Sequence, residues 1–380
     1  MSVSYWKRSL AKERLATVDV CVVGAGIAGL SAADELAQRG KSVVVVEQHG
    51  IGWGASSRNA GYIMRGTAES YAEITDTLGR DIARRVWADS ERNHALLRER
   101  FGADTLSSYQ RVNSELIALS ERDFDLLGRS SEMLDEDGFD APISYGSEAG
   151  DDALHRSLKP LASLTNPGDA AVNPAELISC VNETVGERAS IFESTEVFGL
   201  DHAGNGVRVR TSRGEVEAER VLVCTNAYAG SLLPSLAERV VPNRGQMLAI
   251  HAPDVRLDAS YYVDGGSEYI RQARDGTIVV GGMRKHFEAA ERTSSDEPTA
   301  EVQAALEDFA ERAVGTRGTV VARWAGTMGF TADGLPIVEP IDVDGIDVGR
   351  VWFCGGFTGH GMSLGVVTAH EAVRQMLDQA

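Results

Sequence analysis

The feature that most constrains this chain is a glycine-rich turn between an apolar run and a helical stretch near its start. Residues 18–23 are largely β-branched, the sequence GAGIAG follows at residues 24–29, and an apolar-faced helix is predicted up to Arg39. A second apolar run, residues 42–46, ends on Glu47. Short continuous apolar runs are typical of buried parallel strands, so the sequence predicts a strand–helix–strand unit.

The spacing of this turn indicates a dinucleotide site. Gly24 allows a tight turn, Gly26 lets a pyrophosphate approach the backbone, and Gly29 allows close packing of helix and strand. The helix N-terminus adds backbone amides and a partial positive charge. Glu47 is placed to accept hydrogen bonds from a ribose diol and would repel a 2′-phosphate, which disfavours NADP.

Composition excludes several classes of partner. The chain has 380 residues, 43% of them hydrophobic, and a formal net charge of -19, which would repel nucleic acid and anionic lipid. No apolar run is long enough to span a membrane, and the first residues lack the apolar segment of a secretory signal, so a cytoplasmic location is expected. Four isolated cysteines are predicted to be buried thiols rather than zinc ligands or disulfides: Cys21, Cys180, Cys224 and Cys354.

The remaining pattern alternates helices with strands. Residues 70–101 are predicted to be helical. The segment from Arg244 to Phe330 consists of short strand-like runs separated by turns, which is typical of an antiparallel sheet. Within that segment a helix is predicted to begin at Pro298 with Asp296 as its cap. Near the end, a strand at residues 350–354 is followed by a glycine cluster at residues 355–361 and a final helix from about Ser363. The fold class is therefore α/β.

A second small-residue loop follows the ribose strand, and with it the sequence resembles the D-amino-acid oxidase family of flavoproteins, which includes glycine, sarcosine and γ-glutamylputrescine oxidases. The resemblance spans nearly the whole chain and is carried by the following segments: residues 24–29, 52–61, 193–197, 225–227, 244–246, 333–336 and 356–361. It implies a Rossmann-type FAD-binding domain formed by residues 1–85, 165–240 and 330–380. A mostly antiparallel α+β substrate domain would comprise residues 86–164 and 241–329.

The resemblance also implies which residues hold FAD, through non-covalent contacts. Val197 would contact the adenine side through its backbone, and the C-terminal glycine cluster would lie beside the flavin ring. The implied FAD-binding residues are Gly24, Gly26, Ile27, Ala28, Gly29, Glu47, Gln48, Ala55, Ser56, Ser57, Arg58, Asn59, Ala60, Gly61, Val197, Thr225, Asn226, Gly329, Gly356, Thr358, Gly359, His360, Gly361, Met362 and Ser363. Candidate catalytic residues are Tyr262 and Tyr269, on the segment that roofs the pocket in relatives, and His360. Each of these three also has an ordinary packing or capping interpretation.

Departures from the family pattern bear on the substrate. Where glycine oxidases and D-amino-acid oxidases place a carboxylate-binding arginine, four positions beyond Trp324, this chain has Met328. Arg271 and Arg323 are the alternatives for that role. The absence of this arginine favours a substrate that is a neutral or differently oriented amine. Residues 4–6 and 331–336 also resemble the γ-glutamylputrescine oxidase branch of the family.

Two further departures concern the flavin and its electron acceptor. Gly326 and Arg58 stand where relatives attach flavin covalently, which favours non-covalent FAD. Val279 stands near the place of the lysine that activates oxygen in sarcosine oxidases, so the acceptor is oxygen or another carrier.

The expected function is FAD-dependent oxidation of a small amine: a secondary amine, a polyamine derivative or an amino acid. Hydride transfer to flavin would give an imine that hydrolyses. Two alternatives keep the fold: a flavin-dependent hydroxy-acid dehydrogenase, and a non-catalytic flavoprotein subunit. An NAD-dependent dehydrogenase is disfavoured, because the sequence has no second dinucleotide motif and the C-terminal glycine cluster would have no role.

Overall fold

The computed structural model describes residues 14–186 and 188–379, which form two compact units. The first unit takes in the described residues up to Ser57, then Ile178–Asn243, and the chain from Met328 onward. The second unit consists of Arg58–Leu177 and Arg244–Thr327. Residues 4–6, whose sequence bears on the expected branch of the family, lie outside the described part.

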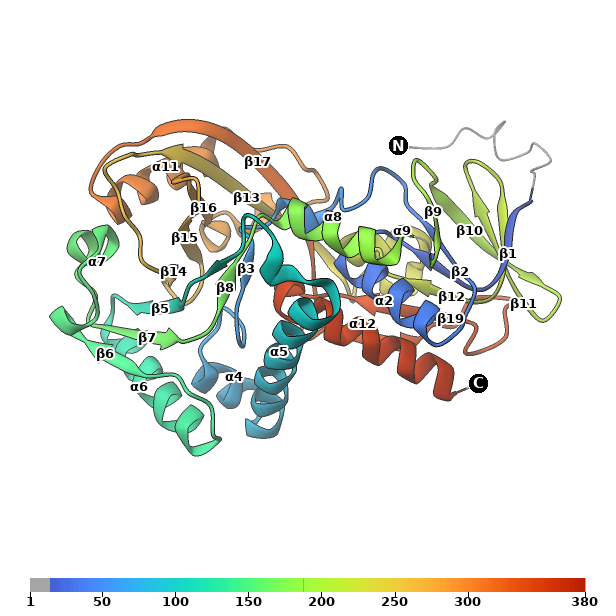
Figure 1. The fold of residues 1–380 in the computed structure, drawn as a ribbon, viewed down its shortest axis with the longest axis horizontal. Helices are drawn as coiled ribbons and strands as arrows, with labels where there is room; N and C mark the ends of the chain where they lie inside the picture. Colours follow the sequence, from blue (N-terminus) through green and yellow to red (C-terminus); the bar gives the residue numbers. More distant parts are fainter. Residues whose placement is uncertain (1–13, 187, 380) are drawn as a thin grey trace. The chain divides into compact units, whose positions relative to one another are not determined.

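A mixed eight-stranded sheet forms the centre of the first unit (Figure 1). Its parallel part has the order β9-β2-β1-β12, and the other edge of β12 pairs with β11 and then with β19. The strands are β1 (Arg14–Val23), β2 (Val43–Val46), β9 (Ser190–Phe192), β10 (Val197–Ala203), β11 (Gly206–Thr211), β12 (Glu215–Val223), β18 (Ile337–Pro340) and β19 (Val351–Gly355). Because β1, β2, β12 and β19 run parallel, their carboxyl ends meet at one edge, where ligands bind in open α/β sheets.

Two long helices, α2 and α12, pack against each other on this sheet (Figure 1). The helical segments that lie wholly or partly in the first unit are α2 (Ile27–Gln38), α3 (Ala55–Arg58), α8 (Pro174–Val185), η3 (Asn226–Tyr228), α9 (Ala229–Leu232), η4 (Pro234–Leu236) and α12 (Gly361–Asp378). The core between the elements is largely valine, including Val23, Val46 and Val223 at the strand ends. These apolar strand ends position the polar residues that follow each of them.

The second unit is built on an eight-stranded sheet of order β17-β13-β16-β15-β14-β5-β7-β6 and a small sheet of order β3-β8-β4. The strands are β3 (Tyr62–Ile63), β4 (Gln110–Arg111), β5 (Ser114–Ala118), β6 (Ile143–Tyr145), β7 (Ala162–Asn166), β8 (Ala170–Ala171), β13 (Val241–His251), β14 (Ser260–Val263), β15 (Glu268–Gln272), β16 (Ile278–Gly282) and β17 (Thr319–Phe330). The helical segments are α4 (Tyr71–Leu78), α5 (Arg80–Phe101), η1 (Ala103–Thr105), α6 (Glu121–Glu136), η2 (Gly146–Glu148), α7 (Ala153–Leu158), η5 (Arg284–His286), α10 (Glu288–Glu291) and α11 (Ala300–Val314). The predicted class, α/β with a mostly antiparallel second part, is confirmed, and the pairing of β14 with β5 is parallel.

Several boundaries in the structure differ from the predicted ones. Residues 58–85 and 165–177, predicted to belong with the dinucleotide fold, lie in the second unit, because α4 packs on α5 and α6 and β3 pairs with β8. The stretch 70–101 is two helices separated at Gly79, whose φ is 91°. The helix predicted to begin at Pro298 begins at Ala300, with Thr299 at the N-cap, because Asp296 has other partners. The last helix begins at Gly361, two residues before the predicted Ser363.

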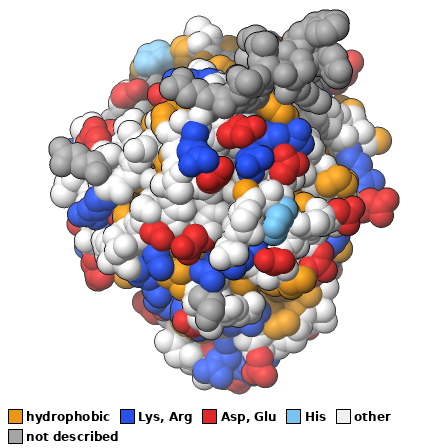
Figure 2. Space-filling model, turned by 90° about the vertical axis from the view of Figure 1, so that its right-hand side faces the viewer, with side chains coloured by type: hydrophobic (Ala, Val, Ile, Leu, Met, Phe, Trp, Pro, Cys, Tyr) orange, Lys and Arg blue, Asp and Glu red, His pale blue; other side chains and the backbone are white. Residues whose placement is uncertain are grey.

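Charged side chains of both signs are interspersed on one face of the molecule. On the face drawn in Figure 2, acidic and basic side chains alternate, with apolar side chains between them. The first unit carries exposed ion pairs such as Arg14 with Glu217 and Arg210 with Asp201. Pairs of this kind contribute little to stability, typically about 0–1 kcal/mol.

A buried charged group lies in the second unit, between α7 and the sheet. The imidazole of His155 lies between two carboxylates, 2.9 Å from Asp152 and 3.4 Å from Glu115. Asp152 also accepts a hydrogen bond from the Tyr261 hydroxyl at 2.5 Å. Although burial opposes it, hydrogen bonds to Asp152 and Glu115 raise the pKa of His155 to about 9, so the side chain is a cation at neutral pH.

This group makes stability fall in alkaline solution. The folded pKa of His155 lies above its ordinary value of 6.5, so its stabilising contribution is complete below pH 6.5 and is lost as pH rises through about 9. We expect the free energy of unfolding of the wild type to decline across this range more steeply than that of His155→Gln, whose side chain does not titrate. Urea unfolding at pH 6.5 and at pH 9.5 measures both. A difference between the two proteins that stays constant with pH would contradict this assignment.

Candidate functional site

The glycine turn of the first unit requires glycine for steric reasons. Gly24 has a φ of +105°, and its N–H donates to the carbonyl of Val46 at 2.8 Å. A Cβ on Gly24 would lie 2.9 Å from the carbonyl oxygen of Cys224, and one on Gly29 would lie 1.9 Å from the carbonyl oxygen of Gly24. The chain therefore passes tightly from β1 into α2, with β2 and β12 on either side.

Two polar side chains surround the start of α2. The carboxylate of Glu47 accepts a hydrogen bond from the backbone of Ala25 and another from that of His49, both at 2.9 Å. The hydroxyl of Ser56 accepts one from the N–H of Ile27, the first residue of α2, at 3.0 Å. A Cβ on Gly26 would lie 2.9 Å from that hydroxyl. The turn, the helix end and Glu47 together fit a dinucleotide, with amides for the pyrophosphate and a carboxylate for the ribose.

The segment before β10 runs beside Glu47. The N–H of Thr195 donates to the carbonyl of Glu47 at 2.7 Å, and that of Ser194 to the carbonyl of His49 at 2.8 Å. Val197 follows as the first residue of β10. A residue not predicted from sequence fixes this arrangement: the carboxylate of Glu193 accepts the N–H of Ile51 at 2.8 Å. The only signal for it was its place in a motif shared with the family.

The C-terminal glycine cluster is held by Asn226. Its side-chain oxygen accepts the N–H of Gly356 at 2.8 Å and that of Phe357 at 3.4 Å. A Cβ on Gly329 would lie 2.8 Å from the same oxygen, so Gly329 leaves room for it. The N–H of Thr358 donates to the carbonyl of Gly329 at 2.9 Å. Asn226, Gly329 and the cluster, all predicted site residues, are thus brought together at the carboxyl ends of β12 and β19.

The first turn of α2 lies close to the second turn of α12. A Cβ on Gly365 would lie 2.9 Å from the side chain of Ile27, so the two helices approach closely near their starts. Two helix N-termini therefore converge, and both favour negative charge. His360 occupies the N-cap position of α12, is 9% exposed, and makes no side-chain capping bond. The capping interpretation of His360 is therefore wrong.

Other predicted FAD-binding residues lie in the first unit around these contacts. Ser57 donates from its hydroxyl to the carbonyl of Gly52 at 2.7 Å, which closes the loop before α3. The remaining predicted residues there are Ala28, in the first turn of α2, Gln48, Ala55, Thr225, Gly359, Gly361, Met362 and Ser363. Each of these residues is positioned by the helix or loop that contains it.

Residues 58–61 belong to the second unit, where they have structural partners. The carbonyl of Arg58 accepts the indole N–H of Trp324 at 2.9 Å. The side chain of Asn59 accepts the N–H of Gly61 at 2.7 Å. Gly61 has a φ of +76°, and a Cβ there would lie 1.9 Å from the carbonyl oxygen of Val172. Close packing within the unit therefore requires Gly61, whatever its relation to a cofactor.

The two predicted catalytic tyrosines lie opposite each other on β14 and β15, and a third tyrosine joins them. Tyr262 pairs with Tyr269 in the strand register, with ring centroids 5.9 Å apart. Tyr62 contacts both, at 5.0 Å edge-on to Tyr262 and 6.0 Å from Tyr269. Ala60, Met247, Val279 and Trp324 complete this cluster, which we call the tyrosine cluster. Sequence reasoning did not include Tyr62, because its partners are distant in the chain.

The neighbouring tyrosine on β14 faces the other way. Tyr261 is buried in the core of the unit, where its hydroxyl bonds to Asp152, so it belongs to the structural charged group. In the tyrosine cluster, burial raises the pKa of Tyr262 and Tyr269 above the ordinary value of 10.0. The phenols there are therefore neutral across the physiological range. Because successive side chains of a strand point to opposite faces of the sheet, Tyr261 and Tyr262 lie on opposite faces of β14. Tyr261 is therefore structural, whereas Tyr262 joins Tyr269 in the tyrosine cluster.

Neither alternative arginine is placed to act as a carboxylate clamp. Arg271 is buried and donates to the carbonyls of Ala60 and Val172. Arg323 donates to Gln303 at 3.0 Å and to Glu307 at 2.6 Å. Both guanidinium groups therefore already have strong partners within the second unit.

One cluster among the described residues has the composition of a metal site. Asp264, Glu268 and His286 offer ligand atoms within 4.8 Å of one another. The ammonium of Lys285 forms an ion pair with Asp264, so a cation already neutralises this group. In the same described part of the chain, no helix is long and apolar enough to cross a membrane.

These features define a class: a dinucleotide-binding α/β fold with a second, largely antiparallel unit, the architecture of flavin-dependent oxidoreductases. Residues 19–375 match the sequence profile of the DAO family, described as FAD dependent oxidoreductase. The chain belongs to this family, and its cofactor is accordingly FAD.

Known proteins of the family are similar over most of their length. The chain is 26% identical over 367 residues to γ-glutamylputrescine oxidoreductase of Escherichia coli, covering 91% of this chain and 80% of that protein. It is 27% identical over 375 residues to glycine oxidase of Pseudomonas aeruginosa, covering 94% and 93%. The crystal structure of glycine oxidase from Geobacillus kaustophilus shares the fold, with a TM-score of 0.78 at 23% sequence identity over 96% of this chain and 95% of that one.

Proposed function

We propose that this FAD-dependent oxidoreductase acts on the CH–NH bond of a small neutral amine. The observation that carries the proposal is the tyrosine cluster, in which the rings of Tyr62, Tyr262 and Tyr269 meet among mostly apolar side chains. Arg271 and Arg323, the arginines considered as carboxylate clamps, are bonded elsewhere. The names of the two similar proteins, one acting on γ-glutamylputrescine and the other on glycine, support an amine substrate.

FAD would be held by the residues gathered at the carboxyl edge of the first unit's sheet. The N–H groups at the start of α2 would bind the pyrophosphate, Glu47 the ribose, and the backbone near Val197 the adenine side. The glycine cluster held by Asn226, with the start of α12, would lie beside the flavin ring and favour negative charge there. When bound, FAD supplies the redox chemistry by accepting a hydride from the carbon next to the amine nitrogen.

The tyrosine cluster would select and orient the amine. The apolar members of the cluster remove hydration from an ammonium ion, which lowers the pKa of the amine and favours the neutral form that can give up a hydride. The charges of Arg284 and Glu69 also act on the phenols of Tyr269 and Tyr262. The phenols of Tyr262 and Tyr269 stay protonated, so each has one hydrogen bond to donate. The Tyr269 hydroxyl donates to the sulfur of Met247 at 3.3 Å and would exchange this weak acceptor for the substrate. No acid–base residue is required for the oxidation itself. The imine product hydrolyses in water to a carbonyl compound and a smaller amine.

The test compares turnover of an amine panel with that of hydroxy acids, with products identified by mass spectrometry. Secondary amines and polyamine derivatives should give the carbonyl product, and hydroxy acids should not. Tyr262→Phe and Tyr269→Phe should each lower kcat/KM by about tenfold, the loss of one oriented hydrogen bond, with FAD affinity unchanged. Tyr145→Phe, at an exposed tyrosine on β6, is the matched control and should leave turnover unchanged. Turnover of hydroxy acids alone would disprove the proposal.

A further inference from the structure

The turn that leads into α12 has a strained residue at its first central position. The N–H of His360 donates to the carbonyl of Phe357 at 2.8 Å, which closes the turn. Its two central residues, Thr358 and Gly359, have φ values of +49° and +93°. Turns with two positive φ values are dominated by glycine, asparagine and aspartate at these positions. A β-branched residue is strained there, so contacts outside the turn must hold Thr358 in place.

Those contacts come from the chain segment that follows β17, in the same unit. The N–H of Thr358 donates to the carbonyl of Gly329 at 2.9 Å. Its hydroxyl accepts the N–H of Thr331 at 3.2 Å and lies 3.2 Å from the Thr331 hydroxyl, closer than the carbonyl of Gly356 at 3.5 Å. Because the Thr331 hydroxyl donates to the carbonyl of Leu335 at 2.9 Å, the Thr358 hydroxyl donates in the contact between the two threonines. Thr331 therefore binds the Thr358 hydroxyl as both acceptor and donor.

The turn is bonded to the elements on either side of it. A Cβ on Gly356, which follows β19, would lie 2.6 Å from the Cγ2 methyl group of Thr331, so this methyl group packs on the glycine. The carbonyl of His360 accepts the N–H groups of Ser363 and Leu364, at 3.1 and 3.0 Å, in the first turn of α12. The direction in which α12 begins therefore depends on the conformation of the turn.

We propose that Thr358 is a positioning residue, which fixes the start of α12 against the bound flavin through its hydroxyl contact with Thr331. The inference rests on the proposed function, because it takes the glycine cluster as lying beside the flavin ring. The N–H groups at a helix start stabilise developing negative charge best when they are oriented in advance. The strain at Thr358 costs folding stability, and the contacts of its hydroxyl offset that cost, so the turn keeps one conformation.

The test uses sulfite, a nucleophile that adds to oxidised flavin and leaves it negatively charged, together with the flavin midpoint potential. Thr358→Val keeps the branched side chain without its hydroxyl, so the strain is no longer offset. Sulfite binding by the FAD-loaded variant should weaken about tenfold, or about 1.4 kcal/mol, and the potential should fall. Thr358→Gly removes more of the side chain, but glycine adopts a positive φ without strain, so it should lose only about threefold. The conservative variant Thr358→Ser keeps the hydroxyl and should recover most of the affinity lost in Thr358→Val.

A second variant and a control separate this role from a general loss of structure. Thr331→Val should reproduce Thr358→Val, and the double variant should be no weaker than either, because both remove the same contact. Thr184→Val removes a hydroxyl that donates to the carbonyl of Cys180 at 3.1 Å in α8, also within the first unit, and should leave both readouts unchanged.

Two results would overturn the inference: no loss of sulfite affinity in Thr358→Val, or a loss in Thr358→Gly as large as that in Thr358→Val. The second result would show that the bulk of the side chain matters and that the strain does not. Neither readout needs an amine, so the proposed substrate class can fail while this result stands.

Discussion

Replacing Gly29 with alanine should abolish useful FAD binding, lowering affinity by at least about 100-fold, or about 2.7 kcal/mol. The added Cβ would lie 1.9 Å from the carbonyl oxygen of Gly24 and 3.4 Å from the Cβ of Cys224. Because the first contact is with backbone, the turn itself must move, and the amides at the start of α2 move with it. Overpacking of this kind should also cost about 1–3 kcal/mol of the free energy of unfolding.

FAD titration of the apoprotein and urea unfolding measure both effects. The matched control is Gly128→Ala, also at a helical glycine, where an added Cβ meets nothing within 4 Å. That variant should bind FAD as the wild type does and gain about 0.5–1 kcal/mol, because alanine is the better helix former. If Gly29→Ala keeps wild-type affinity, the glycine turn is not where the cofactor binds.

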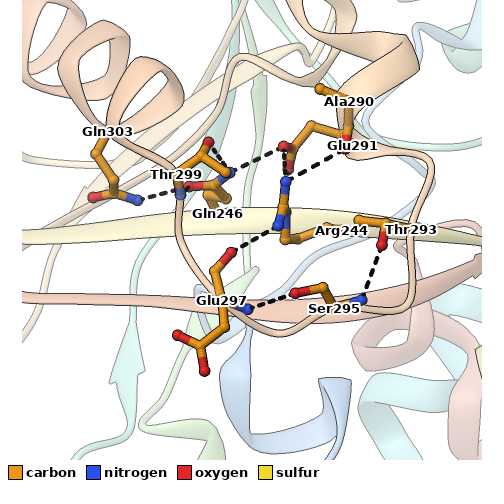
Figure 3. Close-up of polar contacts among 9 residues, drawn as sticks. All are labelled: Arg244, Gln246, Ala290, Glu291, Thr293, Ser295, Glu297, Thr299 and Gln303. Atoms are coloured by element: carbon orange, nitrogen blue, oxygen red, sulfur yellow. Dashed lines mark hydrogen bonds and ion pairs between the residues drawn. The ribbon is translucent and has the colours of Figure 1, made fainter.

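Replacing Glu291 with alanine should lower the free energy of unfolding by about 3–5 kcal/mol, the largest stability effect that we expect. Glu291 is 1% exposed and Arg244 is 5% exposed, so the variant leaves the guanidinium buried without its carboxylate. The amide of Gln246 loses the same partner, as Figure 3 shows. Glu291→Gln keeps a hydrogen-bond acceptor and should lose less.

Urea unfolding at neutral pH checks this expectation. Glu371→Ala removes a carboxylate from an exposed pair with Arg374 on α12 and should change stability by about 0.5 kcal/mol or less. Replacing both members of the buried pair, as Arg244→Met with Glu291→Leu, should restore part of the loss because no unpaired charge remains. Equal losses for Glu291→Ala and Glu371→Ala would show that burial does not set the strength of the pair.

Local patterns in the sequence were sufficient to predict the dinucleotide fold. The run before Gly24, the apolar face of α2 and the short strand ending at Glu47 are features of adjacent residues, and the structure has β1, α2 and β2 there. The same holds for the segment from Arg244 to Phe330, which was predicted to be an antiparallel sheet and contains β13 to β17. Boundaries were predicted less well, because Asp296 takes long-range partners instead of capping the following helix.

Contacts between distant segments could not be read from the sequence. Tyr62 meets Tyr262 only because β3 and β14 are brought together by the fold, and neither segment carries a local sign of it. The bond from Glu193 to Ile51 and the ion pair between Arg58 and Asp296 are of the same kind. The assignment of residues 58–61 also depended on family resemblance, whereas the structure gives these residues partners within the second unit.

The most direct test of the proposed function is the anaerobic absorbance of the FAD-bound protein during titration with secondary amines and polyamine derivatives. Bleaching of the flavin bands by one amine class, with matched hydroxy acids giving none, is the expected result. Recovery of the bands on admission of air would identify oxygen as the electron acceptor, and its absence would indicate another carrier. Flavin that no amine reduces, although dithionite does, would contradict the proposal that the protein is an amine-oxidising enzyme.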